Sequence, residues 1–154
     1  MTGVGVRVAV VPAATTYTLR QQVLRPHQSV AAMALAGDES PATVHLATLE
    51  EAGAATGVLR LQPAACPWRP GRADAWQLRG MAVAEHLRGR GLGGALIAAA
   101  VEHIAERGGG LLWCNARARA EAFYARAGFL AVDARWDEPH IGPHVGMILE
   151  VAAR

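Results

Sequence analysis

The glycine- and arginine-rich run RGRGLGG, at residues 88–94, is the part of this sequence best suited to chemistry. Four of its last six residues are glycine, so its backbone can curl and aim several N–H groups at one point. A helical apolar pattern follows, and the first N–H groups of a helix have no partner within it. We therefore expect the run to bind a phosphate or pyrophosphate. The alternative is a helix start that merely tolerates glycine.

The same run satisfies the dinucleotide-binding pattern GxGxxG through Gly89, Gly91 and Gly94. In dinucleotide-binding folds the first glycine closely follows a strand, and an acidic residue about 20 positions later ends the next strand. Here AEHLR separates Val83 from Gly89, and Asn115 stands where the acidic residue is expected. The context therefore argues against this kind of nucleotide binding.

Strands and helices alternate around the glycine run. Alternating or β-branched stretches predict strands at 6–11, 43–49, 56–62, 76–83, 111–114, 129–135 and 145–151. Helical spacing predicts helices at 16–25, 93–107 and 117–127. The helix at 93–107 joins two strands that should lie parallel. We therefore predict an α/β (α+β) fold with a mixed central β-sheet flanked by helices.

The composition suits one globular domain covering residues 1–154. Charged residues make up 18%, and the formal net charge of +2 favours neither nucleic acid nor a membrane as partner. The 15 basic residues are all arginine, which excludes Schiff-base chemistry and a Walker A loop. Cys66 and Cys114 lack metal-ligand spacing, so we expect reduced thiols, no metal site and a cytoplasmic location.

Several motifs together give the sequence a family likeness. Arg88-x-x-Gly91-x-Gly93 opens a helix after the apolar stretch GMAV, and Asn115 follows the next strand. Residues 122–129, AFYARAGF, look like an A-x-x-F-Y-x-x-x-G-F helix. In this order and spacing, residues 76–130 resemble the GCN5-related N-acetyltransferase (GNAT) family and its acyl-CoA N-acyltransferase fold. Residues 1–75 resemble the family only in their order of strands and helix.

The resemblance implies that acetyl-coenzyme A is the cosubstrate. It places the backbone of Met81 and Val83 along the pantetheine arm, with Ala82 between them, and Asn115 at the pantetheine or beyond it. The resemblance assigns the pyrophosphate to the amides of Arg88, Gly89, Arg90, Gly91, Leu92, Gly93 and Gly94.

Tyr124 matches the family's tyrosine that protonates the departing thiolate. The pKa of a phenol, about 10, is close enough to the pKa of a thiol, about 8.5, for a proton to pass from the phenol to the thiolate. The alternative is that Phe123 and Tyr124 are simply core aromatic residues.

The base that activates the acceptor is a separate question. An amine with a pKa of about 10.4 is protonated at neutral pH, so a base should line the acceptor side. The strand at 76–83 carries no carboxylate, unlike family members that place a glutamate there. We expect His144 as the base, with His140 nearby and Asp74, Asp137 and Glu138 behind them. The alternative is a histidine that makes one hydrogen bond in a turn.

Trp68 lies in the Pro- and Arg-rich loop at 63–75, and we expect it as a lid over the acceptor. The predicted function is transfer of an acetyl group from acetyl-coenzyme A directly to a primary amine of a small molecule or peptide. Cys114 is a poor nucleophile for an acyl-enzyme because it lies in an apolar strand. The alternatives are a non-catalytic acyl-coenzyme A sensor and, more weakly, a nucleotide-binding protein. The resemblance offers a homodimer as the assembly.

Overall fold

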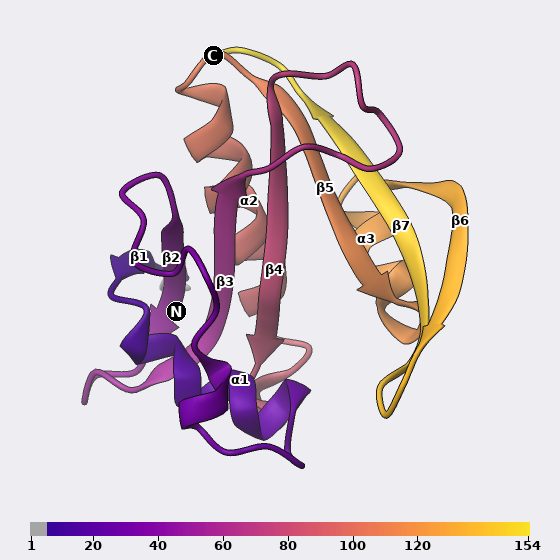
Figure 1. Cartoon of the computed structure of the whole chain (residues 1–154). Coiled ribbons are helices and arrows are strands. Elements are labelled where there is room, and N and C mark those ends of the chain that lie inside the picture. Colours follow the sequence, from indigo (N-terminus) through magenta and orange to yellow (C-terminus); the bar gives the residue numbers. More distant parts are fainter. Residues whose placement is uncertain (1–5) are drawn as a thin grey trace. The chain divides into compact units, whose positions relative to one another are not determined.

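The computed structural model describes residues 6–154, and their strands form a mixed sheet in the order β1-β2-β3-β4-β5-β7-β6 (Figure 1). The strands are β1 (Val8–Val11), β2 (Val44–Leu49), β3 (Ala55–Pro63), β4 (Ala75–Val83), β5 (Gly110–Arg117), β6 (Leu130–Glu138) and β7 (Gly142–Val151). The helices are α1 (Ala14–Leu24), α2 (Leu92–Ala105) and α3 (Glu121–Arg126), with short 3-10 helices η1 (Ala31–Met33), η2 (Glu85–Leu87) and η3 (Ala118–Ala120). The predicted fold class is confirmed.

The chain forms two compact units. The first unit comprises the described residues up to Gln62 together with Gly80–Ala100, and the second comprises Pro63–Arg79 together with Val101–Arg154. A single domain over residues 1–154 stays a prediction from the sequence. Among the described residues, no helix is both long and apolar enough to cross a membrane.

In the first unit, β2 pairs antiparallel with both β1 and β3. Strands β2 and β3 form a hairpin, and the Glu50 N–H donates to Ala54 O at 3.0 Å across its turn. Helix α1 buries Leu19 against Ala47, Val58 and Ala82. It ends just before Pro26, which restricts the preceding residue to extended conformations.

In the second unit, Ala75–Gln77 of β4 pair in parallel with residues 111–113 of β5, which confirms the predicted parallel neighbours. The polypeptide leaves α2 through Gly109, whose N–H donates to Ile104 O at 3.0 Å and whose φ is +80°. Strand β5 then pairs antiparallel with β7, and β7 with β6. Helix α3 contacts β5 and β6 and lies beside these strands in Figure 1.

The predicted helix at 117–127 is partly wrong. Strand β5 continues to Arg117, η3 follows, and α3 begins only at Glu121. The reason is the β5–β7 ladder, in which residues 115–117 lie opposite residues 144–146. Cross-strand hydrogen bonds therefore override a local helical pattern. The last two strands are also longer than predicted and form a hairpin whose turn contains His140 at a φ of +66°.

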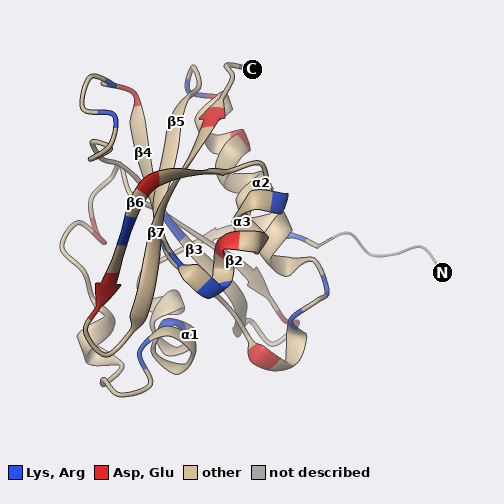
Figure 2. Ribbon diagram, turned by 90° about the vertical axis from the view of Figure 1, so that its right-hand side faces the viewer, with Lys and Arg blue, Asp and Glu red and all other residues tan. Residues whose placement is uncertain are grey.

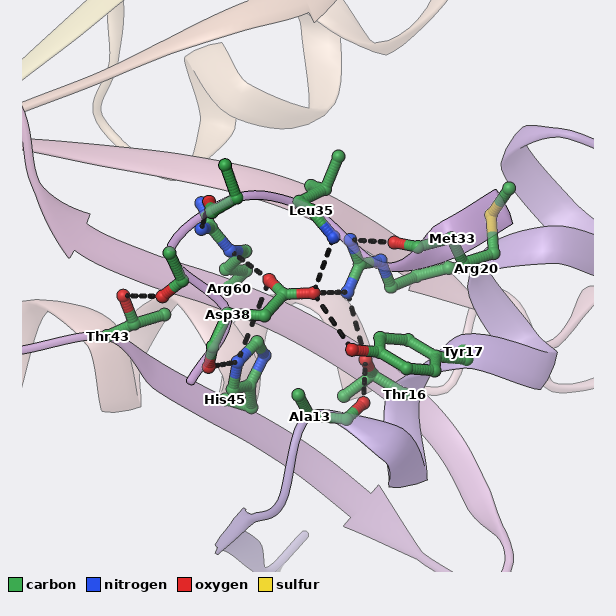
Figure 3. Close-up of polar contacts among 12 residues, drawn as sticks. Ala13, Thr16, Tyr17, Arg20, Met33, Leu35, Asp38, Thr43, His45 and Arg60 are labelled. Carbon is green, nitrogen blue, oxygen red and sulfur yellow. Dashed lines mark hydrogen bonds and ion pairs between the residues drawn. The ribbon is translucent and has the colours of Figure 1, made fainter. Parts of the chain in front are cut away.

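A buried polar cluster connects α1, the segment after it and β3 in the first unit (Figure 3). Asp38 Oδ1 accepts a hydrogen bond from Arg60 Nε at 2.7 Å. Asp38 Oδ2 accepts from the Leu35 N–H at 2.9 Å and from the Tyr17 hydroxyl at 3.1 Å. Arg20 Nη1 lies 3.9 Å from the same oxygen. One carboxylate thus faces two buried guanidinium groups.

The ionised form of Asp38 is favoured despite its burial. Burial by itself raises the pKa of Asp38, but hydrogen bonds from Leu35, Arg60 and Tyr17, with the charge of Arg20, outweigh it and lower the pKa. The two arginine side chains are 4% and 1% exposed, so water cannot replace the carboxylate as their partner.

Replacing Asp38 by asparagine should therefore lower the free energy of unfolding by about 3–5 kcal/mol, because it leaves two buried cations without a counter-charge. Urea unfolding at neutral pH measures this loss. The exposed neighbour Glu39→Gln is the matched control and should change stability by less than about 0.5 kcal/mol. Since the folded pKa lies below the unfolded value of about 3.9, the stabilisation is present above that pH and is lost as pH falls through the folded pKa. Equal stability of Asp38→Asn and the native chain would contradict the prediction.

Candidate functional site

The glycine run leads into α2 in the first unit. Gly89 and Gly91 adopt left-handed φ values of +80° and +82°, which glycine tolerates and other residues rarely adopt. A Cβ atom built at Gly89, Gly91 or Gly94 would meet no heavy atom within 4 Å. Arg88 and Arg90 are exposed. The run is therefore open, and its amides and guanidinium groups suit an anionic group such as a pyrophosphate.

The end of β4 also lies in the first unit. Gly80 has a φ of +59°, and a Cβ there would lie 3.0 Å from Arg20 Nε, so only glycine fits beside that buried arginine. Ala82 packs into the core with Leu19, whereas Met81 and Val83 are half-buried. Ala82 therefore points inward, and its two neighbours in the extended strand point to the other side.

Tyr124 is almost fully buried in the second unit. Its ring makes edge-to-face contacts with Phe123 and Phe129, at centroid distances of 5.2 and 5.3 Å. Burial, with a smaller contribution from Cys114, raises the pKa of Tyr124 well above its usual value. Burial also raises the pKa of Cys114 to about 12, so this residue remains a thiol and is a poor nucleophile.

His144 is held in one tautomer. Its Nδ1 lies 2.9 Å from the carbonyl oxygen of Gly142, and a carbonyl only accepts, so Nδ1 carries the proton. In the neutral ring Nε2 then has the lone pair and is free to take a proton. The ring is 8% exposed and stacks on Trp136, with a centroid distance of 5.7 Å and an interplanar angle of 22°.

A row of aromatic rings continues from this stack. Trp136 lies 6.2 Å from Trp68, which makes an edge contact of 5.6 Å with Trp113. The indole of Trp68 lies against Gly146, where a Cβ would approach its ring carbons to 2.6 Å. The predicted lid residue Trp68 and the predicted base His144 are therefore joined through Trp136.

Trp136 was not among the site residues expected from the sequence. It lies directly opposite His144 in the β6–β7 ladder, but the predicted strand ended at residue 135. His140 is exposed at the hairpin turn. Asp74 does not lie behind His144, because Arg72 binds both Asp74 and Glu150, and Glu150 is six residues further along β7.

Strand alternation separates the candidate acid from the candidate base. In the β5–β7 ladder Asn115 lies opposite Gly146, and Arg117 lies opposite His144. Residues 115 and 117 are two positions apart on β5 and so point to the same face, which places Asn115 and His144 on one side of the ladder. Cys114, which interacts with Tyr124, points to the other face. Asn115 is exposed between the buried residues Cys114 and Ala116. Tyr124 and His144, the residues expected as acid and base, therefore lie on opposite faces of the β5–β7 ladder.

A model of the family described as Acetyltransferase (GNAT) family matches residues 14–129. This chain belongs to the GNAT family. A protein of Bacillus subtilis (strain 168), named as the uncharacterized N-acetyltransferase YitI, is 34% identical over 132 residues, which cover 86% of this chain and 87% of that protein. The membership expected from the sequence, and with it the class of acetyltransferase enzymes, is confirmed.

Solved GNAT structures share the fold. An aminoglycoside 6'-N-acetyltransferase complexed with coenzyme A is 12% identical, with a TM-score of 0.74 over 96% of this chain and 98% of that chain. The GNAT family N-acetyltransferase YhbS of Escherichia coli, in complex with coenzyme A, is 19% identical, with a TM-score of 0.70 over 99% of this chain and 86% of that chain.

Proposed function

We propose that this GNAT protein transfers the acetyl group of acetyl-coenzyme A directly to a primary amine. The observation that carries the proposal is the open glycine run at the start of α2, because its amides and two exposed arginines suit the pyrophosphate of a coenzyme A ester. Two solved structures of the same fold are complexes with coenzyme A, which supports this assignment.

Residues 88–94 bind the pyrophosphate in this proposal, through backbone amides and the side chains of Arg88 and Arg90. The backbone of Met81 and Val83, with Ala82 between them, pairs with the pantetheine arm in the manner of an added strand. Asn115 contacts the pantetheine, because it is the exposed polar side chain in an otherwise buried stretch of β5.

The chemistry consists of one acyl transfer with no acyl-enzyme. The amine nitrogen attacks the thioester carbonyl carbon, the N–C bond forms and the C–S bond breaks. Nε2 of His144 takes a proton from the amine, and the Tyr124 hydroxyl donates to the departing sulfur. Two protons therefore leave the protonated amine. His144 passes the first to solvent, and the second, lost from the nitrogen after its attack, restores the Tyr124 hydroxyl, so the products are the amide, the free thiol and one released proton.

The non-catalytic acyl-coenzyme A sensor is the second candidate. The raised pKa of Tyr124 favours it, because a buried phenol with a raised pKa is a weaker acid than a free one. The proposal of an enzyme requires that Tyr124 donates a hydrogen bond to the sulfur as negative charge develops there.

His140 and Trp68 complete the acceptor side in the proposal of an enzyme. That proposal also includes a cytoplasmic location, a homodimer and no metal.

Replacing Gly94 by glutamate tests the coenzyme site. The side chain has open space, and an acidic residue near a helix N-terminus is favourable, so the unliganded protein should keep its melting temperature. A carboxylate beside the pyrophosphate should weaken acetyl-coenzyme A binding about 100-fold, measured by isothermal titration calorimetry. Ala98→Glu, at an exposed position on the same helix, is the matched control and should bind normally. Equal affinity of both variants would remove the pyrophosphate assignment.

Replacing Tyr124 by phenylalanine tests the acid. The ring contacts with Phe123 and Phe129 remain, so the fold and the dissociation constant for acetyl-coenzyme A should stay unchanged. The value of kcat should fall about 100-fold, because general acid catalysis is lost. Thiol release with an accepted amine measures the rate. Tyr17→Phe removes the hydroxyl of the only other tyrosine and should keep kcat. An unchanged rate in Tyr124→Phe would leave Tyr124 as a core aromatic residue.

Replacing His144 by glutamine tests the base. At pH 7 kcat/KM should fall about 100-fold, and the deficit should shrink as pH approaches the pKa of the amine, since the acceptor then loses its proton without help. The pH profile of kcat/KM measures this convergence. His103→Gln in the same unit should follow the native profile. A deficit that stays constant with pH would assign His144 a structural role only.

A further inference from the structure

Three side chains share one face at the hairpin end of β6 and β7. Trp136 lies opposite His144 in the ladder, and Glu138 lies opposite Gly142. Trp136 and Glu138 are two residues apart on one strand, so they point to the same side. The indole N–H of Trp136 donates to Glu138 Oε1 at 2.9 Å, while the indole ring stacks on His144. The Glu138 carboxylate is thus hydrogen-bonded to the edge of the Trp136 indole, and the face of the same indole stacks on the proposed base, His144.

Exposure increases along this row from the base outward. His144 is buried, Trp136 is half-buried and Glu138 is exposed. Figure 2 shows the end of β6 as acidic. The row therefore runs from the buried ring of His144 through the half-buried indole of Trp136 to the exposed negative charge of Glu138.

Other charged side chains on these strands lie at different positions relative to His144. Arg117 lies opposite His144 on β5, on the side away from Trp136. Asp137 alternates to the other face of β6. Arg135 is engaged by both carboxylate oxygens of Glu121, at 3.0 Å each. Glu138 therefore provides a negative charge for a second ammonium group on the β6 side of His144.

We propose that the acceptor is an aliphatic diamine, with one amine at Nε2 of His144, its methylene chain against the indole of Trp136 and its second ammonium group at the Glu138 carboxylate. This inference rests on the proposed function and adds the substrate class to it. Glu138 is a specificity-determining residue in this arrangement. The chemistry of the acetyl transfer is unchanged.

A set of amines with equal chain length but different far ends tests the proposal. The set is 1,4-diaminobutane, butylamine and 4-aminobutanoate, together with the corresponding six-carbon compounds. For the native protein, kcat/KM should be about fivefold higher for the diamine than for the monoamine, and lowest for the amino acid, as expected of one partly exposed ion pair. The melting temperature of the acetyl-coenzyme A complex should also rise most with the diamine.

Glu138→Gln is the decisive variant, because its amide oxygen still accepts from Trp136 while the negative charge is lost. The ratio of kcat/KM for diamine and monoamine should fall to about one, because only the diamine loses an ion pair. Asp133→Asn, an exposed carboxylate on the same strand, is the matched control and should keep the native ratio.

Three results would overturn the diamine assignment. They are a diamine preference that survives Glu138→Gln, a preference for the amino acid, and no stabilisation by diamines of a protein that does bind acetyl-coenzyme A. In each of these cases the proposed function still stands. A native protein that binds no acetyl-coenzyme A defeats the proposed function itself, so the two failures are distinguishable.

Discussion

The antiparallel ladder between β5 and β7 determines which side chains of the second unit work together. Eight residue pairs, from Gly110 with Val151 to Arg117 with His144, hold the two strands in one register. Because side chains alternate along each strand, a shift by one residue would exchange the two faces. If β7 moved in this way, His144 would lie on the side of Tyr124, while Cys114 and the other side chains of β5 would keep their places. The separation of the proposed donor from the proposed acceptor is therefore a property of the backbone pairing.

Burial acts differently on the two candidate proton-transfer groups. Tyr124 is enclosed by aromatic rings, and the loss of water stabilises its neutral, protonated form. His144 is nearly as buried, but one of its nitrogens is engaged by a backbone carbonyl, so its other nitrogen is the acceptor. Burial thus keeps the proton on the proposed donor, whereas a backbone hydrogen bond fixes which nitrogen of the proposed base can accept one.

Local patterns in the sequence predicted much of this structure. Helix α2 was predicted because its apolar spacing is a local signal, and the parallel neighbours β4 and β5 because a strand–helix–strand crossover fixes how its two strands can pair. The start of α3 was predicted wrongly because the pairing of residues 115–117 with β7 is formed by residues about 30 positions away in the chain. The same holds for Trp136, whose contact with His144 depends on how far the last hairpin extends.

The polar cluster around Asp38 shows the same limit in the first unit. Asp38 and Arg60 are 22 residues apart, and the segment between α1 and β2 has no clear apolar period, so nothing in the sequence brings the two together. Tyr124 and His144 were named from the sequence. Their positions on different faces, which decide how a reaction could proceed, emerged only from the ladder.

The contact between Trp68 and Gly146 has a consequence for how this protein and its relatives differ. The indole of Trp68 lies where a side chain at position 146 would otherwise be, because Gly146 has none. The size of the residue at position 68 therefore decides how this space beside β7 is filled. If Trp68 borders the acceptor as proposed, a smaller residue at this one loop position would make room for a larger acceptor without a change in the strands that carry His144 and Tyr124.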